Sequence, residues 1–501
     1  MIRTLKTIGK LALCGALIAG TTSCSDYLEE VNRSNFTQDN YFTSAQQAQT
    51  AINGIYDRLR MFNEDNGYGE RPWVSLELIN GHATTLGQSF FNSQFINYTA
   101  DAANPATRTI WQRSYNAIGN ANLAIQRIPA ISIEEAQKKN LLGQAYFLRA
   151  FFYYQLVRLY GDVPLITAPI DAASPNLYPS RSPQLEVYAL IVNDLMQAEQ
   201  AGLPANDQSG RITVGAVKSL LSSVYLTMAG YPLQQTDNYA KAAAKAKEVL
   251  DAGTYSLFPS YDYLHDNAHK NQGEFILQAQ YASGIATNAI SALVIPYFAR
   301  ISVYGDEYGA LIPTNAFFNS YEAGDLRTQE RQFYFSSYPS ISDTSQVVNF
   351  GVHALYKYFH KESALNRNIL PDQNWTLLRL PEVMLIYAEA SNEVSGPTAA
   401  AYAEINKIRA RAQLKPLSGL TKEQFREAIW KERYHELAYE NKAYFDLQRT
   451  RRAYDVTTNT FVNAVGYKNV SGATFTEKYL LWGIPQYETN NNRNLTQNPG
   501  W

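Results

Sequence analysis

Two glutamates near the end of the chain have the residue type and spacing for hydrolytic chemistry. Glu432 and Glu436 are four residues apart in a helical pattern, so both carboxylates are expected on one helix face. Two carboxylates that face one cleft can act as acid and base on a glycosidic bond. The neighbouring Arg433, Asp446 and Arg449 favour another interpretation, an ion network that holds the last helices together. We therefore predict a structural role for all five residues and no catalytic residue.

Two histidines form a second pattern with possible chemical use. His265 and His269 are four residues apart and could share a metal ion if their segment were helical. The segment YDYLHDNAHK has turn character and lacks a zincin-type glutamate, so surface histidines are the favoured interpretation. The chain also contains no GxSxG, P-loop or HExxH motif, and no GxGxxG beside a strand and a helix. The sequence predicts a protein that is not an enzyme, with no metal and no cofactor.

Aromatic residues in two loop-like regions are candidates for ligand binding. Flat rings stack on the apolar faces of sugars, while amides, carboxylates and arginines bind the hydroxyl groups. The predicted ligand-binding set is Trp73, Phe90 and Phe91 in the first region and Tyr297, Arg300, Tyr304 and Tyr308 in the segment IPYFARISVYGDEYG. Packing inside the fold is the alternative for each of them.

These regions need a scaffold, and helical periodicity predicts one. Residues 44–62 carry apolar side chains at helical spacing, which predicts an amphipathic helix with Ser44 as a candidate N-cap. The period is lost over residues 63–105, so we predict a long loop region there. It returns over residues 110–128, which predicts a second helix.

The most aromatic stretch of the chain belongs to one long predicted helix. Ser132 with Glu135 fits a capping box. Gly161 fits a C-cap, so a helix of roughly 28 residues, about 42 Å, should end at Tyr160. This helix has two apolar stripes, and two stripes require two covering neighbours. We predict that its aromatic side chains form core and not a binding site.

Two helix pairs repeat along the chain. The segments VYLTMA (224–229) and VMLIYA (383–388) match in pattern. Each is followed by an alanine-rich helix that begins with tyrosine, over 239–250 and 402–412. Helix pairs of this size are similar to degenerate tetratricopeptide repeats, which stack into a continuous body.

Residues 254–375 interrupt the helical pattern. They hold 22 aromatic residues in turn-rich segments. Long structured loops on a rigid scaffold often carry binding residues. We predict an all-α dominated fold in a single domain, 24–501. Helices over about 40–253 and 376–460 would form its scaffold, and about 254–375 would form a loop-rich ligand-binding excursion.

The N-terminus predicts export and lipid anchoring. Residues 1–23 combine three cations with an apolar run of ten residues, 11–20, as in a signal peptide, and this run is too short to span a bilayer. Cys24 follows Thr-Thr-Ser directly and resembles a lipobox cysteine, which predicts lipidation at Cys24. The formal net charge of −2 offers no basic surface for nucleic acid. The only predicted membrane contact is the lipid anchor.

Five segments together resemble a known family. They are CSDYLEE with FTQDNYFTSAQQAQTAINGIYDRL, QAYFLRAFFYYQLVRLYGDVPLI, RLPEVMLIYAEASNE with INKIRARAQL, FREAIWKERYHELAYENKAYFDLQR, and LWGIPQYETNNNRNLTQNPGW. In this order, and over nearly the whole mature chain, they resemble the SusD/RagB family of nutrient-binding outer-membrane lipoproteins. The resemblance implies four tetratricopeptide-like units, surface exposure at the outer membrane, and delivery of glycans or peptides to a SusC-like TonB-dependent transporter. These motifs belong to the scaffold, so they do not identify the ligand.

Four functions therefore remain open. Capture of a glycan or oligosaccharide is the leading one. Capture of a peptide would require a deep cavity lined by groups that bind a peptide backbone. A surface glycoside hydrolase would require two carboxylates in one cleft. A purely structural repeat adaptor would need no ligand site at all.

Overall fold

The computed structural model describes residues 42–64, 70–87, 89–170 and 174–501. Helices dominate this part of the chain, and its strands form four two-stranded sheets. The predicted all-α dominated fold is confirmed. The predicted signal peptide and Cys24 lie outside the described residues.

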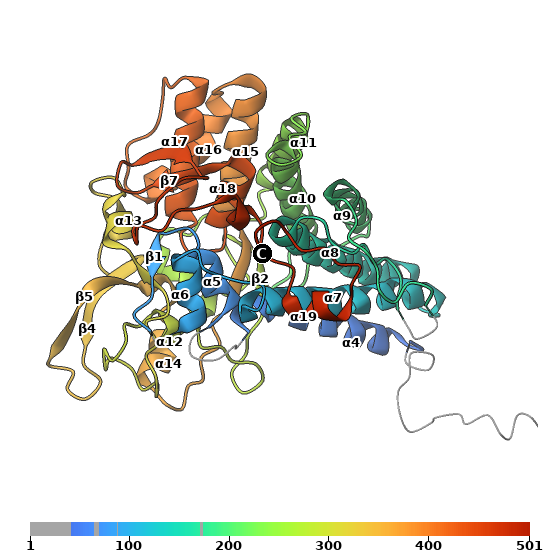
Figure 1. Ribbon diagram of the computed structural model, residues 1–501, viewed down its shortest axis with the longest axis horizontal. Helices are drawn as coiled ribbons and strands as arrows, with labels where there is room; N and C mark the ends of the chain where they lie inside the picture. The colour runs from blue at the N-terminus through green and yellow to red at the C-terminus, as the bar shows by residue number, and fades with distance from the viewer. Residues whose placement is uncertain (1–41, 65–69, 88, 171–173) are drawn as a thin grey trace, which may run out of the picture.

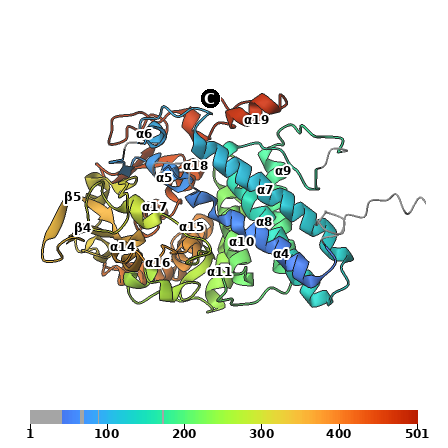
Figure 2. The same ribbon diagram turned by 90° about the horizontal axis from the view of Figure 1, so that it is seen from below.

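Long helices form the body of the molecule (Figure 1). The first group is α4 (Ala45–Tyr56), α7 (Pro105–Arg127), α8 (Glu135–Tyr160), α9 (Gln184–Glu199), α10 (Val214–Ala229) and α11 (Asn238–Asp251). The second group is α15 (Leu380–Ser395), α16 (Ala399–Arg411), α17 (Lys422–Glu436) and α18 (Ala443–Thr450). Helix α11 packs against α15 and joins the groups, while α4 and α7 lie side by side (Figure 2). No helix of the described ranges has both the length and the apolar character needed to cross a membrane.

Helix α8 is the core helix that its sequence predicts. It packs against α7 on one side and α9 on the other, which supplies the two covering neighbours. Phe152 and Tyr153 are fully buried in the main hydrophobic core. Gly161 has φ +74° at the C-cap, a conformation that glycine adopts without strain. The predicted capping box is wrong, because Glu134 occupies the N-cap position and makes no side-chain capping bond.

The helix predicted over 44–62 is confirmed with one change. The Ser44 hydroxyl accepts the N–H of Gln47 at 3.3 Å, so Ser44 caps α4 as predicted. After Tyr56 the chain tightens into a 3-10 helix, Asp57–Asn63, which buries Leu59 and Phe62.

The prediction of a long loop over residues 63–105 is wrong. The region contains α5 (Pro72–Leu78), α6 (Phe90–Ile96) and the short strand β1 (Ala83–Thr84). Both helices are seven residues long, which is too short to produce a clear apolar period. Every residue of α5 is buried, so its sequence lacks the polar face of a surface helix.

The repeated helix pairs stack as predicted. Helix α10 packs on α11, and α15 packs on α16, so both segments that match in pattern begin an antiparallel pair. A separate apolar cluster lies between α15, α16 and α17, with Leu385, Ile405 and Ile429 at its centre.

The interruption after α11 is held by strands from distant parts of the chain. Strand β2 (Phe275–Ala279) pairs antiparallel with β6 (Trp375–Arg379), so the ends of the excursion meet. Between them, β4 (Tyr334–Pro339) and β5 (Val347–Leu355) form a hairpin, and β3 (Ile312–Pro313) pairs with β1. The short helices here are α12 (Ile290–Val294), α13 (Asn315–Asn319) and α14 (Lys361–Leu365). Near the C-terminus, β7 (Arg452–Asp455) pairs with β8 (Thr460–Asn463), and α19 (Gln486–Asn491) follows.

Candidate functional site

The glutamate pair on α17 belongs to a buried ion network. Glu432 Oε1 lies 2.7 Å from Arg327 Nη1, and Glu436 Oε1 lies 2.6 Å from Arg379 Nη1 and 2.6 Å from Arg411 Nη2. Burial opposes ionisation of Glu436, but Arg411, Arg379 and Arg327 outweigh it and lower the pKa to about 2. Both carboxylates are enclosed by their partners, so they cannot approach a glycosidic bond. The predicted structural role is confirmed for both.

The other charges of this segment form a second network beside the first. Asp446 lies 2.9 Å from Arg433 Nε and 2.7 Å from Arg449 Nε. Arg449 Nη2 also donates to Glu389 at 2.8 Å. The structural role predicted for Arg433, Asp446 and Arg449 is confirmed.

His265 and His269 do not form a metal site. They lie on separate one-turn segments, and the described residues contain no group of three or more histidines, cysteines or carboxylates able to hold a metal. His269 stacks on Tyr263 and is half-buried. His265 is buried between the carbonyl oxygens of Lys357 and Gln332, at 2.8 and 3.0 Å, so its prediction as a surface histidine is wrong.

Trp73 is a core residue, and its prediction as a ligand-binding ring is wrong. Its exposed fraction is 0%. Its indole N–H donates to the carbonyl of Tyr439 at 2.9 Å, and its ring packs against Tyr358 and Trp375. Neither face of the indole can reach a ligand, because α5 is buried on all sides.

Three exposed apolar side chains mark the candidate site, which we call the apolar loop surface. They are Leu86 (43% exposed), Tyr297 (41%) and Phe298 (70%). The Tyr297 and Phe298 rings are 4.0 Å apart between centroids. The predicted ligand-binding residue Phe90 is 68% exposed at the start of α6, where it contacts the half-buried Phe91 edge to face. Exposed apolar side chains that lie together are candidates for a binding surface.

The two loops that carry this surface are joined at the backbone. The N–H of Leu86 donates to the carbonyl of Gly309 at 2.8 Å. A Cβ on Gly309 would lie 2.9 Å from the Tyr297 nitrogen and 3.1 Å from the Leu86 Cβ. A Cβ on Gly87 would lie 2.6 Å from the carbonyl oxygen of Tyr308. These close contacts hold the loop around residue 86 against the loop around residue 297. A ligand-binding site shared by the two loops would require this arrangement.

The loop that presents Phe298 is strained and then anchored. Phe298 and Arg300 have φ +59° and +57°, which are unfavourable for residues with a side chain. The buried carboxylate of Glu307 accepts the N–H groups of Ile301 and Ser302, at 2.9 and 3.0 Å, and it also accepts the N–H of Arg300. Backbone strain that the surroundings maintain is typical of ligand-binding loops.

The remaining predicted residues differ in exposure: Arg300 is exposed, while Tyr304 and Tyr308 are half-buried. Arg300 is exposed beside the ring pair and is available to a polar ligand. Tyr304 is half-buried, and its hydroxyl lies 2.6 Å from that of Ser363. Burial raises the pKa of Tyr304, so this hydroxyl stays protonated. Tyr308 is also half-buried and packs against the main core. The packing contacts of both tyrosines favour a structural role.

Two residues of the surface are absent from the predicted set. Phe298 stands beside Tyr297 in a turn-rich segment, which is a signal that could have identified it. Leu86 carries no comparable signal, because a single leucine in a loop is usually buried or incidental. Its position becomes informative only when its contact with Gly309 is known.

The fold and this surface define a class: a helical-repeat protein that displays an exposed apolar surface on loops. Two family models match the chain, one described as the SusD family over residues 326–501 and one as starch-binding, associating with the outer membrane, over residues 26–226. The chain belongs to the SusD family.

Similar proteins extend over almost the full chain. A SusD superfamily protein from Parabacteroides distasonis is 36% identical with a TM-score of 0.89, and the match covers 92% of this chain and 100% of the other. SusD-like protein P2 from Formosa agariphila is 28% identical over 97% of this chain and 98% of its own length. The starch-binding protein SusD from Bacteroides thetaiotaomicron is 23% identical over 99% of both chains.

Proposed function

We propose that this protein captures a glycan or oligosaccharide at the cell surface and delivers it to a SusC-like TonB-dependent transporter. A lipid on Cys24 would anchor it to the outer membrane, and the apolar loop surface would hold the ligand. The observation that carries the proposal is the exposed Tyr297 and Phe298 pair on a strained, anchored loop. The relatives described as starch-binding support a carbohydrate as the ligand class.

The chemistry of the surface suits a sugar. Tyr297 and Phe298 offer flat faces for stacking, and Arg300 offers donors for hydroxyl groups nearby. Their exposure fits a shallow site that binds part of a long chain. We propose binding without hydrolysis, because Glu432 and Glu436, the glutamates spaced for it, are engaged by buried arginines.

A panel experiment tests this function. The purified protein is incubated with neutral and acidic polysaccharides, their oligosaccharides and mixed peptides, and both binding and product release are scored. We expect binding of at least one saccharide and no release of shorter products. Binding of peptides alone would assign the protein to peptide capture. Release of sugars would show a hydrolase, and binding of neither class would contradict a ligand-capture role.

A further inference from the structure

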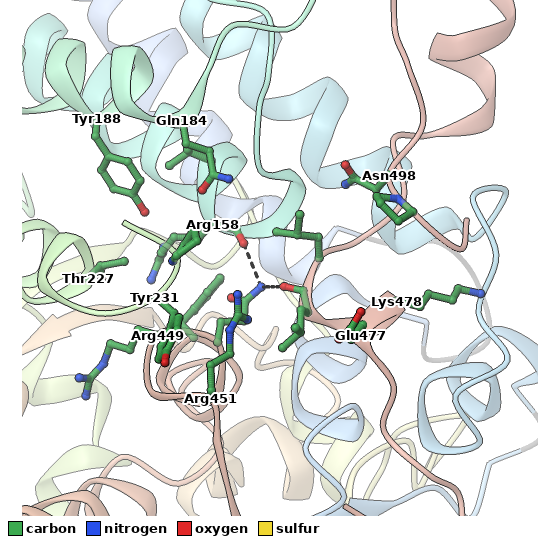
Figure 3. A pocket seen from close by; sticks show the side chains of 17 residues that line it. Arg158, Gln184, Tyr188, Thr227, Tyr231, Arg449, Arg451, Glu477, Lys478 and Asn498 are labelled. Atoms are coloured by element: carbon green, nitrogen blue, oxygen red, sulfur yellow. Dashed lines mark hydrogen bonds between the residues drawn. The ribbon is translucent and has the colours of Figure 1, made fainter. Parts of the chain in front are cut away.

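A cavity lies between helices of the body, apart from the apolar loop surface. It has a volume of about 280 Å³ and is lined by residues of α8, α9, α10 and α18, with the C-terminal residues from 477 to 499 as a further wall (Figure 3). None of the three residues of the apolar loop surface lines it, so the cavity is a separate place from the proposed glycan site.

A buried hydroxyl without a partner faces this cavity. Tyr188 is 2% exposed, and its hydroxyl points from α9 toward the cavity centre on the side of Arg158 (Figure 3). Within the described part of the chain this hydroxyl forms no hydrogen bond. Since the residue lines the cavity, the hydroxyl is free to donate to water or to a ligand that enters it.

The charges that line the cavity indicate what kind of ligand could accept a hydrogen bond from Tyr188. Arg158 and Arg451 line the cavity as cations that form no ion pair with a carboxylate of the described ranges. Arg449 also lines it but is paired with Glu389 and Asp446, and the Lys478 ammonium points away from the cavity and donates to the Ala100 carbonyl (Figure 3). Among the described lining residues, Glu477 is the only acidic side chain. The lining therefore has an excess of positive charge, which favours an anion.

The arginines are held in place for this role. The Arg158 guanidinium lies 3.7 Å from the Tyr154 ring centroid and 3.6 Å from that of Phe445, so its plane is fixed between two rings. Its Nε and Nη2 donate to the Tyr154 carbonyl and to Gln155. Its Nη1 has no hydrogen-bond partner in the described ranges. Arg451 lies over the Tyr231 ring at 5.4 Å.

We propose that this cavity binds a small carboxylate carried on a single ring. The Tyr188 hydroxyl and Arg158 would donate to the carboxylate, and Arg451 would add charge. Val157, Leu480, Leu481 and Pro499 provide apolar wall for the ring. The cavity volume is close to about 300 Å³, the lower end of the usual range for ligand pockets, so it suits a single ring rather than a chain of rings. A sugar acid and an aromatic acid share this chemistry.

Calorimetry on the purified full-length protein tests the proposal with defined probes. Sodium glucuronate represents the sugar acid and sodium benzoate the aromatic acid, with glucose and inorganic phosphate as comparisons. We expect one saturable site for at least one carboxylate, weakened by added salt because the attraction is ionic. The acid with the lower Kd identifies whether the preferred ring is a sugar or an aromatic ring. Glucose should not bind, and phosphate should bind more weakly than the preferred acid.

Two variants make the test specific. Tyr188→Phe should weaken carboxylate binding about tenfold or more, because it removes a hydrogen bond to a charged group. Its melting temperature should not fall, since the hydroxyl has no protein partner to lose. Arg451→Gln should weaken binding in the same way, and Phe298→Ala should leave it unchanged.

Three results would overturn the proposal. The first is that neither acid binds with a Kd below about 10 mM. The second is that phosphate binds as tightly as the acids. The third is that Tyr188→Phe binds them as well as the wild type does. Glycan binding measured on Tyr188→Phe separates this proposal from the proposed function. If the protein binds a glycan but no carboxylate, the proposed cavity ligand is refuted and the proposed function stands.

Discussion

Glu307 is the residue that most directly organises the loop behind Phe298. Its carboxylate accepts three backbone N–H groups, of Arg300, Ile301 and Ser302, and the Ser302 hydroxyl at 2.8 Å. The loop is therefore ordered before a ligand arrives. A preformed loop loses less conformational entropy on binding, so more of the contact energy remains as affinity.

His82 predicts a measurable pH dependence of stability. It stacks on Phe317, and burial lowers its pKa to about 4, below its usual value of 6.5. Between these values the unfolded chain takes up a proton that the folded chain does not. The free energy of unfolding should therefore fall as the pH falls from about 6.5 to about 4, by about 3 kcal/mol from this residue.

Chemical unfolding of the wild type and of His82→Phe at several pH values checks this. The variant keeps a ring but cannot take up the proton, so the stability difference between the two proteins should shift in its favour as the pH falls. Glu77, whose pKa burial raises to about 8, contributes the opposite slope equally in both proteins. A stability difference that does not change with pH would contradict the account of His82.

At the scale of elements, the junction of two loops depends on Gly87. A Cβ at this position would lie 2.6 Å from a backbone oxygen, so Gly87→Ala should force the loops apart. We expect weaker ligand binding by about tenfold with a small loss of stability, since one surface contact changes. Gly305→Ala is the matched control, because nothing lies within 4 Å of its added Cβ. Equal binding by both variants would show that the junction does not position the site.

The long helices are predictable because their information is local. Over the 26 residues of α8, the apolar period repeats often enough to define two buried faces, and Gly161 marks the end. The alanine-rich helices α11 and α16, which follow α10 and α15, are predictable from the same kind of local pattern. The presence of an ion network around α17 is predictable from its mixed charges, but its partners are not, because Glu432 and Glu436 pair with Arg327, Arg379 and Arg411 from distant segments.

The site could be predicted only in part, because its geometry depends on contacts distant in sequence. Trp73 and Phe298 are both aromatic residues in turn-rich surroundings, yet one is covered by Tyr358 and Trp375 and the other is exposed. The positive φ of Phe298 belongs to a loop that Glu307 anchors, and no local pattern encodes it. The pairing of β2 with β6 likewise joins segments that are about one hundred residues apart.

At the scale of the whole molecule, the predicted lipid anchor at Cys24 is separate in sequence from the proposed binding surface. If Cys24 carries the lipid, Cys24→Ala should move the protein from the membrane fraction to the soluble fraction or leave it unprocessed, because its anchor is lost. Cys14→Ala is the matched control, since this cysteine lies in the predicted signal peptide. Cell fractionation with an antibody to the protein reads out both. Normal membrane retention of Cys24→Ala would contradict the predicted anchor.

The central claim is that the apolar loop surface binds the saccharide, and titration calorimetry of Phe298→Ala tests it most directly. The ring is 70% exposed, so its loss should leave the melting temperature unchanged. Loss of one central stacking ring should cost about 1–3 kcal/mol of binding, a roughly five- to 150-fold weaker Kd. Tyr178→Ala, which removes a ring that is 58% exposed outside this surface, should bind as the wild type does. Wild-type affinity of a normally folded Phe298→Ala would contradict the account.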